Sequence, residues 1–298
     1  MKIVRTPDER FAGLPHWPYA PRYVDVHGLR VHVVDEGPAD GPVMLLLHGE
    51  PSWSYLYRHW IPVLVDAGYR AVAVDSIGFG RSDKVTDPDW YSLAHHVDQL
   101  VGVIEALDLR RITVVVQDWA GPVGLVTATE HDERFARLVI MNTWLHHHGY
   151  QYTEALHRWH EAAKQPELPF GSIVAFSSAG SSQDPAEVLE AGFAAPFPTR
   201  EHMVGAVAWP AMLPFADPER SGAERQAAAF AALARWDRPA HLFFGDQDPV
   251  FTVEWGRAFA AAIPGATFDV VEGAHHFVQE VGRPLAERVL AAIAAETA

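Results

Sequence analysis

The clearest indication of the architecture is residues 113–122, which read Thr113-Val114-Val115-Val116-Gln117-Asp118-Trp119-Ala120-Gly121-Pro122. A short apolar run leads into a tight turn and then into the start of a helix, with the aspartate at the turn. This pattern is typical of a strained strand-to-helix turn that lifts one side chain above a sheet. An aspartate at such a place is more often a helix N-cap. A reactive role for Asp118 therefore depends on what the rest of the chain contributes.

Length, composition and charge limit the class of protein. A chain of 298 residues, 49% apolar and 20% charged, is long enough for one large globular core, or for one core with an inserted layer. The net charge of −15 opposes binding to nucleic acid or to an anionic membrane and favours a small neutral substrate. The chain has no cysteine, which excludes disulfides and thiolate catalysis. With no apolar signal segment and no run long enough to span a membrane, we expect a cytoplasmic protein.

Strand-like and helix-like segments alternate along most of the chain. The first two strand-like runs read as an antiparallel hairpin around His27-Gly28, and the six that follow are short and continuously apolar, as in sheets buried on both faces. This alternation predicts an α/β fold with a mainly parallel, eight-stranded sheet and helices on both faces. The expected strands are 23–26, 30–35, 43–47, 71–74, 113–116, 138–141, 241–244 and 267–271, and the expected helices include 93–107, 121–130, 253–262 and 284–295.

Residues 145–226 have a different character. Strand patterns disappear there, and Ala, Glu, His and Trp alternate with prolines. The many aromatic side chains of the segment need burial, which argues against a flexible, disordered linker. We therefore expect a helical insertion, a cap, over the carboxyl ends of the strands. The chain then divides into a first part of the core at 1–144, the cap at 145–226 and a second part of the core at 227–298.

Three loops that follow strand-like runs carry groups with catalytic chemistry. The first holds Asp118, the second offers Asp246 and Asp248, and the third offers His275 and His276. The chain order of nucleophile, acid and histidine is that of the α/β-hydrolase fold rather than of the chymotrypsin or subtilisin types. Since an open α/β sheet binds its ligand beyond the carboxyl ends of its strands, we expect the three loops to converge there.

The chain resembles the haloalkane dehalogenases of the α/β-hydrolase superfamily. Gln117-Asp118-Trp119 at the turn is specific within that superfamily, and the glutamate after His48-Gly49 points to the branch whose third triad member is an aspartate. The matching segments span nearly the whole chain: HGEPSWSYLYR (48–58), IGFGRSDK (77–84), VQDW (116–119), AAPFP (194–198) and HFVQE (276–280).

The resemblance implies a role for each matching position. Asp118 is expected to be the nucleophile, His276 the base and Asp248 its partner. The backbone N–H groups of Glu50 and Trp119 are expected to form the oxyanion hole, and the Trp119 indole to bind halide. The acid is taken as Asp248 because the family's acid lies three residues past the glycine that ends the strand, and the base as His276 because it directly precedes Phe-Val-Gln-Glu.

The residue types then suggest a mechanism in two steps. A carboxylate with a pKa near 4 is ionised at neutral pH, so Asp118 can displace a halide and form an alkyl ester without a base. Water activated by His276 would hydrolyse that ester. The expected partners are a small apolar halogenated substrate, water and the released halide, with no metal or organic cofactor. We expect a monomer or a small homo-oligomer.

One departure from the family concerns the second halide donor, which this branch is expected to carry in the cap. Residues 170–193 contain no tryptophan. Phe176 could fill the space, but it has no N–H group. Trp144, Trp159 and Trp209 are possible substitutes, although the sequence favours ordinary packing for each.

Two other functions compete with dehalogenation. An epoxide hydrolase also uses an aspartate at the turn, but it needs proton donors, usually two well-separated cap tyrosines, and here the cap offers only Tyr150 and Tyr152. A catalytically silent binding protein of the same fold is the second alternative, and the intact set of Asp118, Asp248 and His276 argues against it. Residues 146–148 are three consecutive histidines, whose side chains diverge and so rarely hold one metal ion.

Overall fold

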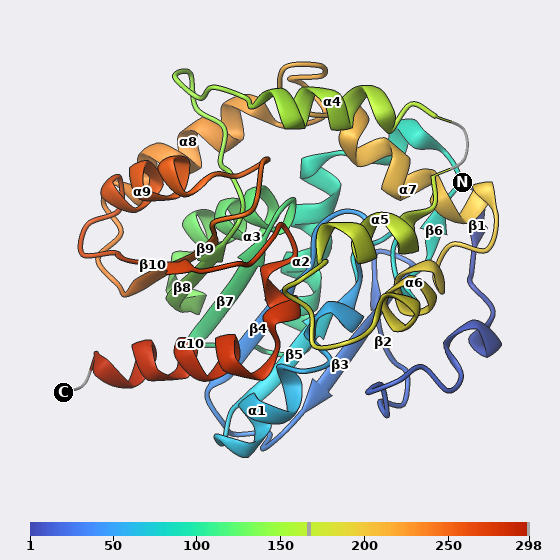
Figure 1. Cartoon of the computed structure of the whole chain (residues 1–298), viewed down its shortest axis with the longest axis horizontal. Helices are drawn as coiled ribbons and strands as arrows, with labels where there is room; N and C mark the ends of the chain where they lie inside the picture. The colour runs from blue at the N-terminus through green and yellow to red at the C-terminus, as the bar shows by residue number, and fades with distance from the viewer. Residues whose placement is uncertain (166–167, 297–298) are drawn as a thin grey trace.

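An eight-stranded, mainly parallel sheet forms the centre of the protein, as the sequence predicts (Figure 1). The computed structural model describes residues 1–165 and 168–296. The strand order is β10-β9-β8-β7-β4-β5-β3-β2; the pairs β2–β3 and β3–β5 are antiparallel and the other pairs are parallel. The strands are β2 Arg22–Val26, β3 Leu29–Glu36, β4 Val43–Leu47, β5 Arg70–Val74, β7 Ile112–Gln117, β8 Phe135–Met141, β9 Ala240–Gly245 and β10 Thr267–Val271.

Helices cover both faces of this sheet, and the alternation of side chains along each strand supplies a core to each layer. Along β4, Leu45 and Leu47 pack into one core, whereas Met44 and Leu46 pack into the other. Burial of one such side chain contributes about 1.5–3 kcal/mol. The first core is shared with α2 Leu93–Ala106, α3 Ala120–Glu130 and α9 Val253–Ala261, and the second with α1 Ile61–Asp66 and α10 Arg283–Ala295.

The chain between β8 and β9 is helical, as expected for residues 145–226. In Figure 1, α4, α5 and α6 lie along the top and right of the molecule, and α1 and α10 lie along the bottom. The helices of this segment are α4 Glu154–Ala162, α5 Phe170–Ser177, α6 Ala186–Ala194, α7 Arg200–Ala211 and α8 Ala223–Leu233. The boundary expected at residue 226 falls inside α8, so the exact division into core and cap stays a prediction.

Several short elements carry no clear pattern in the sequence. They are β1 Ile3–Val4 and β6 Lys84–Val85, which form a two-stranded antiparallel sheet, and the 3-10 helices η1 Asp8–Phe11, η2 Ser54–Tyr57, η3 Pro88–Trp90, η4 Asp132–Arg134 and η5 Val278–Val281. Elements of two to four residues show too little periodicity to be predicted locally. Within the described parts of the chain, no helix combines the length and the apolar character needed to cross a membrane.

Candidate active site

Asp118 lies at the tip of a sharp turn between β7 and α3. Its φ is +53°, a left-handed conformation that is costly for a residue other than glycine and persists only where the surroundings enforce it. The surroundings do so here: the N–H of Asp118 donates to the carbonyl of Asn142 at 3.0 Å, and the N–H of Gly121 donates to the carbonyl of Asp118 at 2.9 Å. The turn therefore holds the carboxyl group in one place, where it lines the cavity described below.

Backbone N–H groups fix the orientation of this carboxyl group. The N–H of Glu50, in the loop after β4, donates to Oδ1 of Asp118 at 2.7 Å, and the N–H of Trp119 donates to the same carboxyl group. Gly49 allows the close approach, because a Cβ at that position would overlap Cβ and Oδ1 of Asp118. Donors of this kind match the oxyanion hole expected at Glu50 and Trp119.

The loop that carries Glu50 is itself held by a buried imidazole. His48 Nδ1 donates to the carbonyl of Gly49 at 2.8 Å, and His48 Nε2 accepts the N–H of Ser76 at 3.0 Å. Both ring nitrogens are thus used by backbone groups in a way that suits the neutral ring. Burial lowers the pKa of His48, in agreement with a neutral imidazole at physiological pH.

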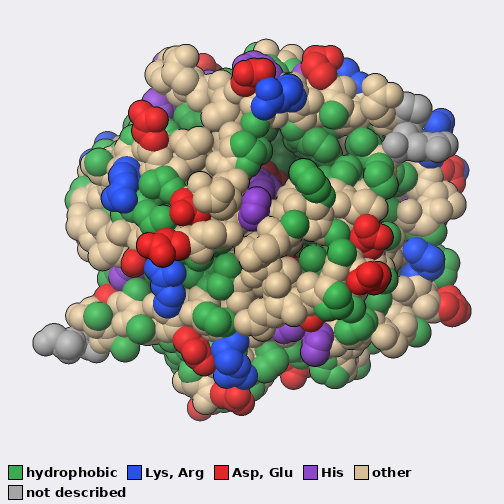
Figure 2. Space-filling model, in the orientation of Figure 1, with side chains coloured by type: hydrophobic (Ala, Val, Ile, Leu, Met, Phe, Trp, Pro, Cys, Tyr) green, Lys and Arg blue, Asp and Glu red, His purple; other side chains and the backbone are tan. Residues whose placement is uncertain are grey.

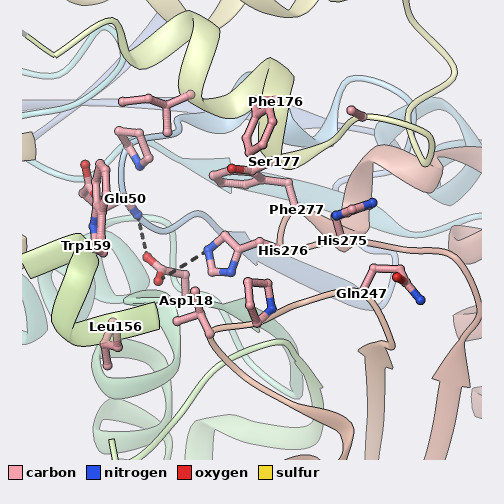
Figure 3. A pocket seen from close by; sticks show the side chains of 15 residues that line it. Glu50, Asp118, Leu156, Trp159, Phe176, Ser177, Gln247, His275, His276 and Phe277 are labelled. Atoms are coloured by element: carbon pink, nitrogen blue, oxygen red, sulfur yellow. Dashed lines mark hydrogen bonds and ion pairs between the residues drawn. The ribbon is translucent and has the colours of Figure 1, made fainter. Parts of the chain in front are cut away.

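His276 and Asp248 complete a triad with Asp118. His276 Nε2 lies 3.7 Å from Oδ2 of Asp118 (Figure 3). His276 Nδ1 lies 3.0 Å from Oδ2 of Asp248. The amide of Asn142 donates to the same Asp248 oxygen at 2.8 Å, and the N–H of Val250 donates to Asp248 Oδ1 at 2.8 Å. Asp248 is therefore a fixed acceptor that orients the imidazole with Nε2 toward Asp118.

The pKa values of the pair reflect burial opposed by charge. Burial raises the pKa of Asp118, and the nearby His276 together with the N–H groups of Glu50 and Trp119 only partly offsets that rise. Burial on its own would lower the pKa of His276, but the charge and hydrogen bond of Asp248, with the charge of Asp118, outweigh it and raise the pKa. The base is thus more strongly basic than a free histidine.

The neighbouring acid and histidine are placed differently. Asp246 is exposed and accepts the N–H of Gly273 at 2.8 Å. His275 lines the cavity but is not the histidine bonded to Asp248. From each pair, the structure thus brings to Asp118 the residue that the resemblance selects, namely Asp248 and His276.

A cavity of about 540 Å³ opens beside the triad, between α4, α5 and the loops after β9 and β10. Its lining is mostly apolar: Pro51, Leu156, Trp159, Ile173, Phe176, Ala179, Pro249, Val250 and Phe277 lie beside Glu50, Asp118, Ser177, Gln247, His275 and His276. Figure 2 shows a hollow on this face, bordered by hydrophobic side chains with a histidine at its edge. A largely apolar cavity suits a small apolar substrate.

Trp159 is the tryptophan of the cap that faces this cavity. Its indole N–H donates to Oε2 of Glu50 at 3.1 Å, beside Asp118 (Figure 3). Burial, followed by the charge of Asp118, raises the pKa of Glu50 well above its usual range, although the bond from Trp159 opposes this. The sequence favours ordinary packing for Trp159, whereas the structure places its side chain, which α4 carries, at the wall of the cavity.

The other tryptophans under discussion have packed surroundings. Trp119 is 3% exposed and packs at 5.0 Å against Trp144 and at 5.6 Å against Trp209. Trp144 is fully buried and stacks on Phe251 at 5.1 Å. Trp209 is fully buried and donates its N–H to His96 Nε2 at 2.7 Å. Phe176 lines the cavity, in the region where the sequence has no tryptophan.

Two buried polar residues near the triad were not assigned a role from the sequence. Asn142 binds Asp248 as described and also accepts the N–H of Gly245 through its side-chain oxygen at 2.8 Å. The side-chain amide nitrogen of Gln117 lies 3.1 Å from both Nε2 and the carbonyl oxygen of His276. Asn142 directly follows β8, just as Asp118, Asp248 and His276 lie in the loops after β7, β9 and β10. A polar residue directly after a buried strand was therefore the signal that could have identified Asn142.

The groups invoked by the competing functions lie elsewhere. Tyr150 and Tyr152 do not line the cavity; Tyr150 packs on Trp255 at 4.6 Å, and the Tyr152 hydroxyl lies 2.7 Å from Nδ1 of His146. The rings of His146 and His148 are 6.4 Å apart. In residues 1–165 and 168–296, no group of three or more His, Cys, Asp or Glu side chains is arranged to hold a metal ion.

A strand-turn-helix aspartate with a histidine and a second acid after later strands defines a hydrolase of the α/β type, and residues 42–283 match the α/β-hydrolase fold family. The haloalkane dehalogenase of Mycobacterium marinum is 43% identical over 302 residues, 97% of this chain and 99% of that protein. The corresponding protein of Psychrobacter cryohalolentis is 37% identical and covers 96% of both chains. A tetrameric haloalkane dehalogenase from Paraglaciecola agarilytica NO2 superimposes with a TM-score of 0.91 at 37% identity, covering 98% of both chains. Within its fold family, the chain belongs to the haloalkane dehalogenases.

Proposed function

We propose that the protein hydrolyses haloalkanes through a covalent ester on Asp118. The overall reaction, which converts a haloalkane and water into an alcohol and halide, follows from the family. The observation that carries the mechanism is the position of the Asp118 carboxyl group, which lines an apolar cavity. The N–H of Glu50 lies at one carboxyl oxygen, and His276 Nε2 lies 3.7 Å from the other. That arrangement supplies a nucleophile, an oxyanion hole and a base at one point.

In the first step, Oδ2 of Asp118 attacks the carbon that bears the halogen. The new C–O bond forms as the C–halogen bond breaks, and the halide leaves with the bonding electrons. Oδ1, held by Glu50 N–H at 2.7 Å, then becomes the carbonyl oxygen of the ester. Because the leaving group is an anion that needs no proton, hydrogen-bond donors are sufficient to stabilise it.

We infer that Trp119 and Trp159 are the halide donors. The role of Trp119 rests on its match to the family, and that of Trp159 rests on its indole N–H beside Asp118 in the cavity. The raised pKa of Glu50 favours its neutral acid, which accepts a hydrogen bond more weakly than a carboxylate does. The Trp159 N–H can therefore leave Glu50 for an arriving halide.

In the second step, His276 takes a proton from water as the water oxygen attacks the ester carbon. The charge that develops on Oδ1 is stabilised by the N–H groups of Glu50 and Trp119, each worth about 3–4 kcal/mol in comparable sites. The intermediate expels the alkoxide, which takes the proton from His276 and leaves as alcohol. Asp248 stabilises the imidazolium in between, and Asp118 returns to its carboxylate with loss of one proton to solvent.

Halide release from 1,2-dibromoethane and 1-bromobutane tests this function directly. The parent protein should release bromide from both, and Asp118→Ala should release none. Styrene oxide serves as a further substrate, because an epoxide hydrolase would convert it to a diol. The proposal is wrong if the protein converts styrene oxide to the diol but releases bromide from neither bromoalkane.

Three further features are proposals of the same kind. We propose that residues 145–226 act as a cap over the site, that the location is cytoplasmic, and that the protein is a monomer or a small homo-oligomer. The neighbour from Paraglaciecola agarilytica is tetrameric. Light scattering after size-exclusion chromatography would distinguish a monomer from such an assembly.

A further inference from the structure

Gln117, the last residue of β7, contacts the proposed base directly but takes no part in either step above. Its side chain is fully buried, and its amide nitrogen lies 3.1 Å from both Nε2 and the main-chain carbonyl oxygen of His276. A side-chain amide nitrogen carries two hydrogens, which is enough for both of these atoms. Gln117 therefore holds the ring and the main chain of the same residue.

The contact with Asp248 decides which ring nitrogen of His276 carries the hydrogen. Nδ1 lies 3.0 Å from Oδ2 of Asp248, and a carboxylate oxygen only accepts hydrogen bonds. In the neutral ring, Nδ1 therefore carries the hydrogen and Nε2 presents a lone pair. The amide of Gln117 is the donor to that lone pair, since Oδ2 of Asp118 is an acceptor and lies 3.7 Å away.

The main-chain carbonyl of His276 keeps the Gln117 amide in this orientation. If the amide turned over, Oε1 would take the place of the nitrogen and would face both the carbonyl oxygen and the Nε2 lone pair. Within residues 1–165 and 168–296, the buried Oε1 has no hydrogen-bond partner, a cost that the two bonds donated to His276 offset. The amide thus remains a donor toward Nε2 for as long as it binds the carbonyl.

The charges around the ring act in the opposite direction. Among the described residues, these charges are those of Asp248, in the loop after β9, and Asp118, in the turn after β7; both raise the pKa of His276. The aromatic rings beside it, Phe251 and Phe277, are neutral. A hydrogen bond donated to the lone pair favours the neutral ring and so limits the rise of the pKa. More of the base is then able to take a proton from water at neutral pH.

We propose that Gln117 is a positioning residue for the second step: its amide holds His276 in place with Nε2 unprotonated and ready to take the proton of water. This role rests on the proposed function and acts through the base rather than on the substrate. When water donates to Nε2, it takes the place of one amide hydrogen, while the other keeps its bond to the carbonyl, so the ring stays in position. Once Nε2 is protonated, it faces a donor on Gln117, which favours transfer of the proton to the alkoxide.

The test is the pH dependence of ester hydrolysis in Gln117→Met, which keeps the length of the side chain and removes both N–H groups. The ester on Asp118 is formed from 1-bromobutane in a single turnover, and its decay is followed by rapid quenching and mass spectrometry. We expect the acidic limb to move up by roughly half to one pH unit, while ester formation, which needs no base, keeps the parent rate. Gln279→Met is the control, because Gln279 is equally buried and its amide binds Tyr57. Its acidic limb should match that of the parent.

The role of Gln117 is overturned if the limb of Gln117→Met stays at the parent pH or moves down, or if Gln279→Met shows the same shift. The dehalogenase function stands in those cases, because the ester still forms and bromide is still released. If the parent protein forms no ester from 1-bromobutane and releases no bromide, both claims are wrong. Gln117→Glu, which has nearly the same shape, decides if Gln117→Met does not fold. Its carboxylate would accept from the imidazolium, so the limb should again move up, and an unshifted limb overturns the role.

Discussion

The indole N–H of Trp159 lies 3.1 Å from Oε2 of Glu50, so helix α4 of the cap meets the loop after β4 directly beside the nucleophile. The same Glu50 donates its backbone N–H to Asp118. One residue thus links the proposed oxyanion hole, through its main chain, to the proposed halide site, through its side chain. A displacement of α4 would break the contact between Trp159 and Glu50. We therefore expect it to weaken halide binding more than it alters the distances between Asp118, His276 and Asp248.

Trp159→Phe keeps the aromatic ring but removes the N–H group. We expect weaker binding of bromide and a loss of roughly tenfold or more in kcat/KM, since a hydrogen bond to an anion is worth about 1.5–3 kcal/mol. The measurement is product inhibition by bromide together with initial rates on 1-bromobutane. Trp209→Phe is the control, because its N–H binds His96. Equal losses in the two variants would contradict a halide role for Trp159.

His276→Ala should stop the reaction at the ester. Asp118 needs no base to displace the halide, whereas hydrolysis of the ester does. We expect a burst of one bromide per protein molecule and a mass increase equal to the alkyl group, located on Asp118 by peptide mapping. An unmodified protein that nevertheless releases one bromide would show that the covalent step is wrong.

The pH dependence should report the state of His276. Only the neutral imidazole can take a proton from water, and the pKa of His276 is raised above 6.5. Activity should therefore fall as the pH drops through a value above 6.5, and it should be retained on the alkaline side.

Asp248→Asn should move that acidic limb to lower pH, because it removes a charge that raises the pKa of His276. The plateau rate should fall on the order of 10⁴-fold, as for loss of the orienting acid in a serine hydrolase. Asp246→Asn changes the exposed neighbour, so both the limb and the plateau should stay near those of the parent. An unshifted limb in Asp248→Asn would mean that another group controls the profile.

Gly49→Ala should disable the nucleophile while the fold remains. The added methyl would overlap Cβ and Oδ1 of Asp118, so the carboxyl group must move away from the N–H of Glu50. A displacement of about 1 Å at such a position costs roughly 10²-fold in rate. Circular dichroism would check the fold, and Gly149→Ala, in an exposed loop, serves as control. Full activity of Gly49→Ala would show that the carboxyl group is not held as described.

Local sequence was sufficient for the central sheet and for the order of the catalytic groups. The eight expected strands coincide with the eight strands of the sheet. For β4 and β7, which are buried along their whole length, the reason is that a strand buried on both faces needs a continuous apolar run, which is visible without any long-range information. Four helices of the core, α2, α3, α9 and α10, were visible because their apolar spacing is local, whereas the short helix α1 was not among those expected. Short elements such as β1 and β6 depend on pairing between Ile3 and Val85, which no local pattern records.

The site divides in the same way. The residue types and their order along the chain placed Asp118, a pair of acids and a pair of histidines after strands that end at one edge of the sheet, because parallel strands bring their carboxyl ends together. The choice of Asp248 and His276 within those pairs came from the resemblance to the family. The side chains that face this edge from residues 145–226 depend on how α4 and α5 pack. Contacts between segments far apart in sequence hold these two helices over the sheet. Only the tertiary structure could therefore turn Trp159 into the cavity and leave Trp144 and Trp209 in the core.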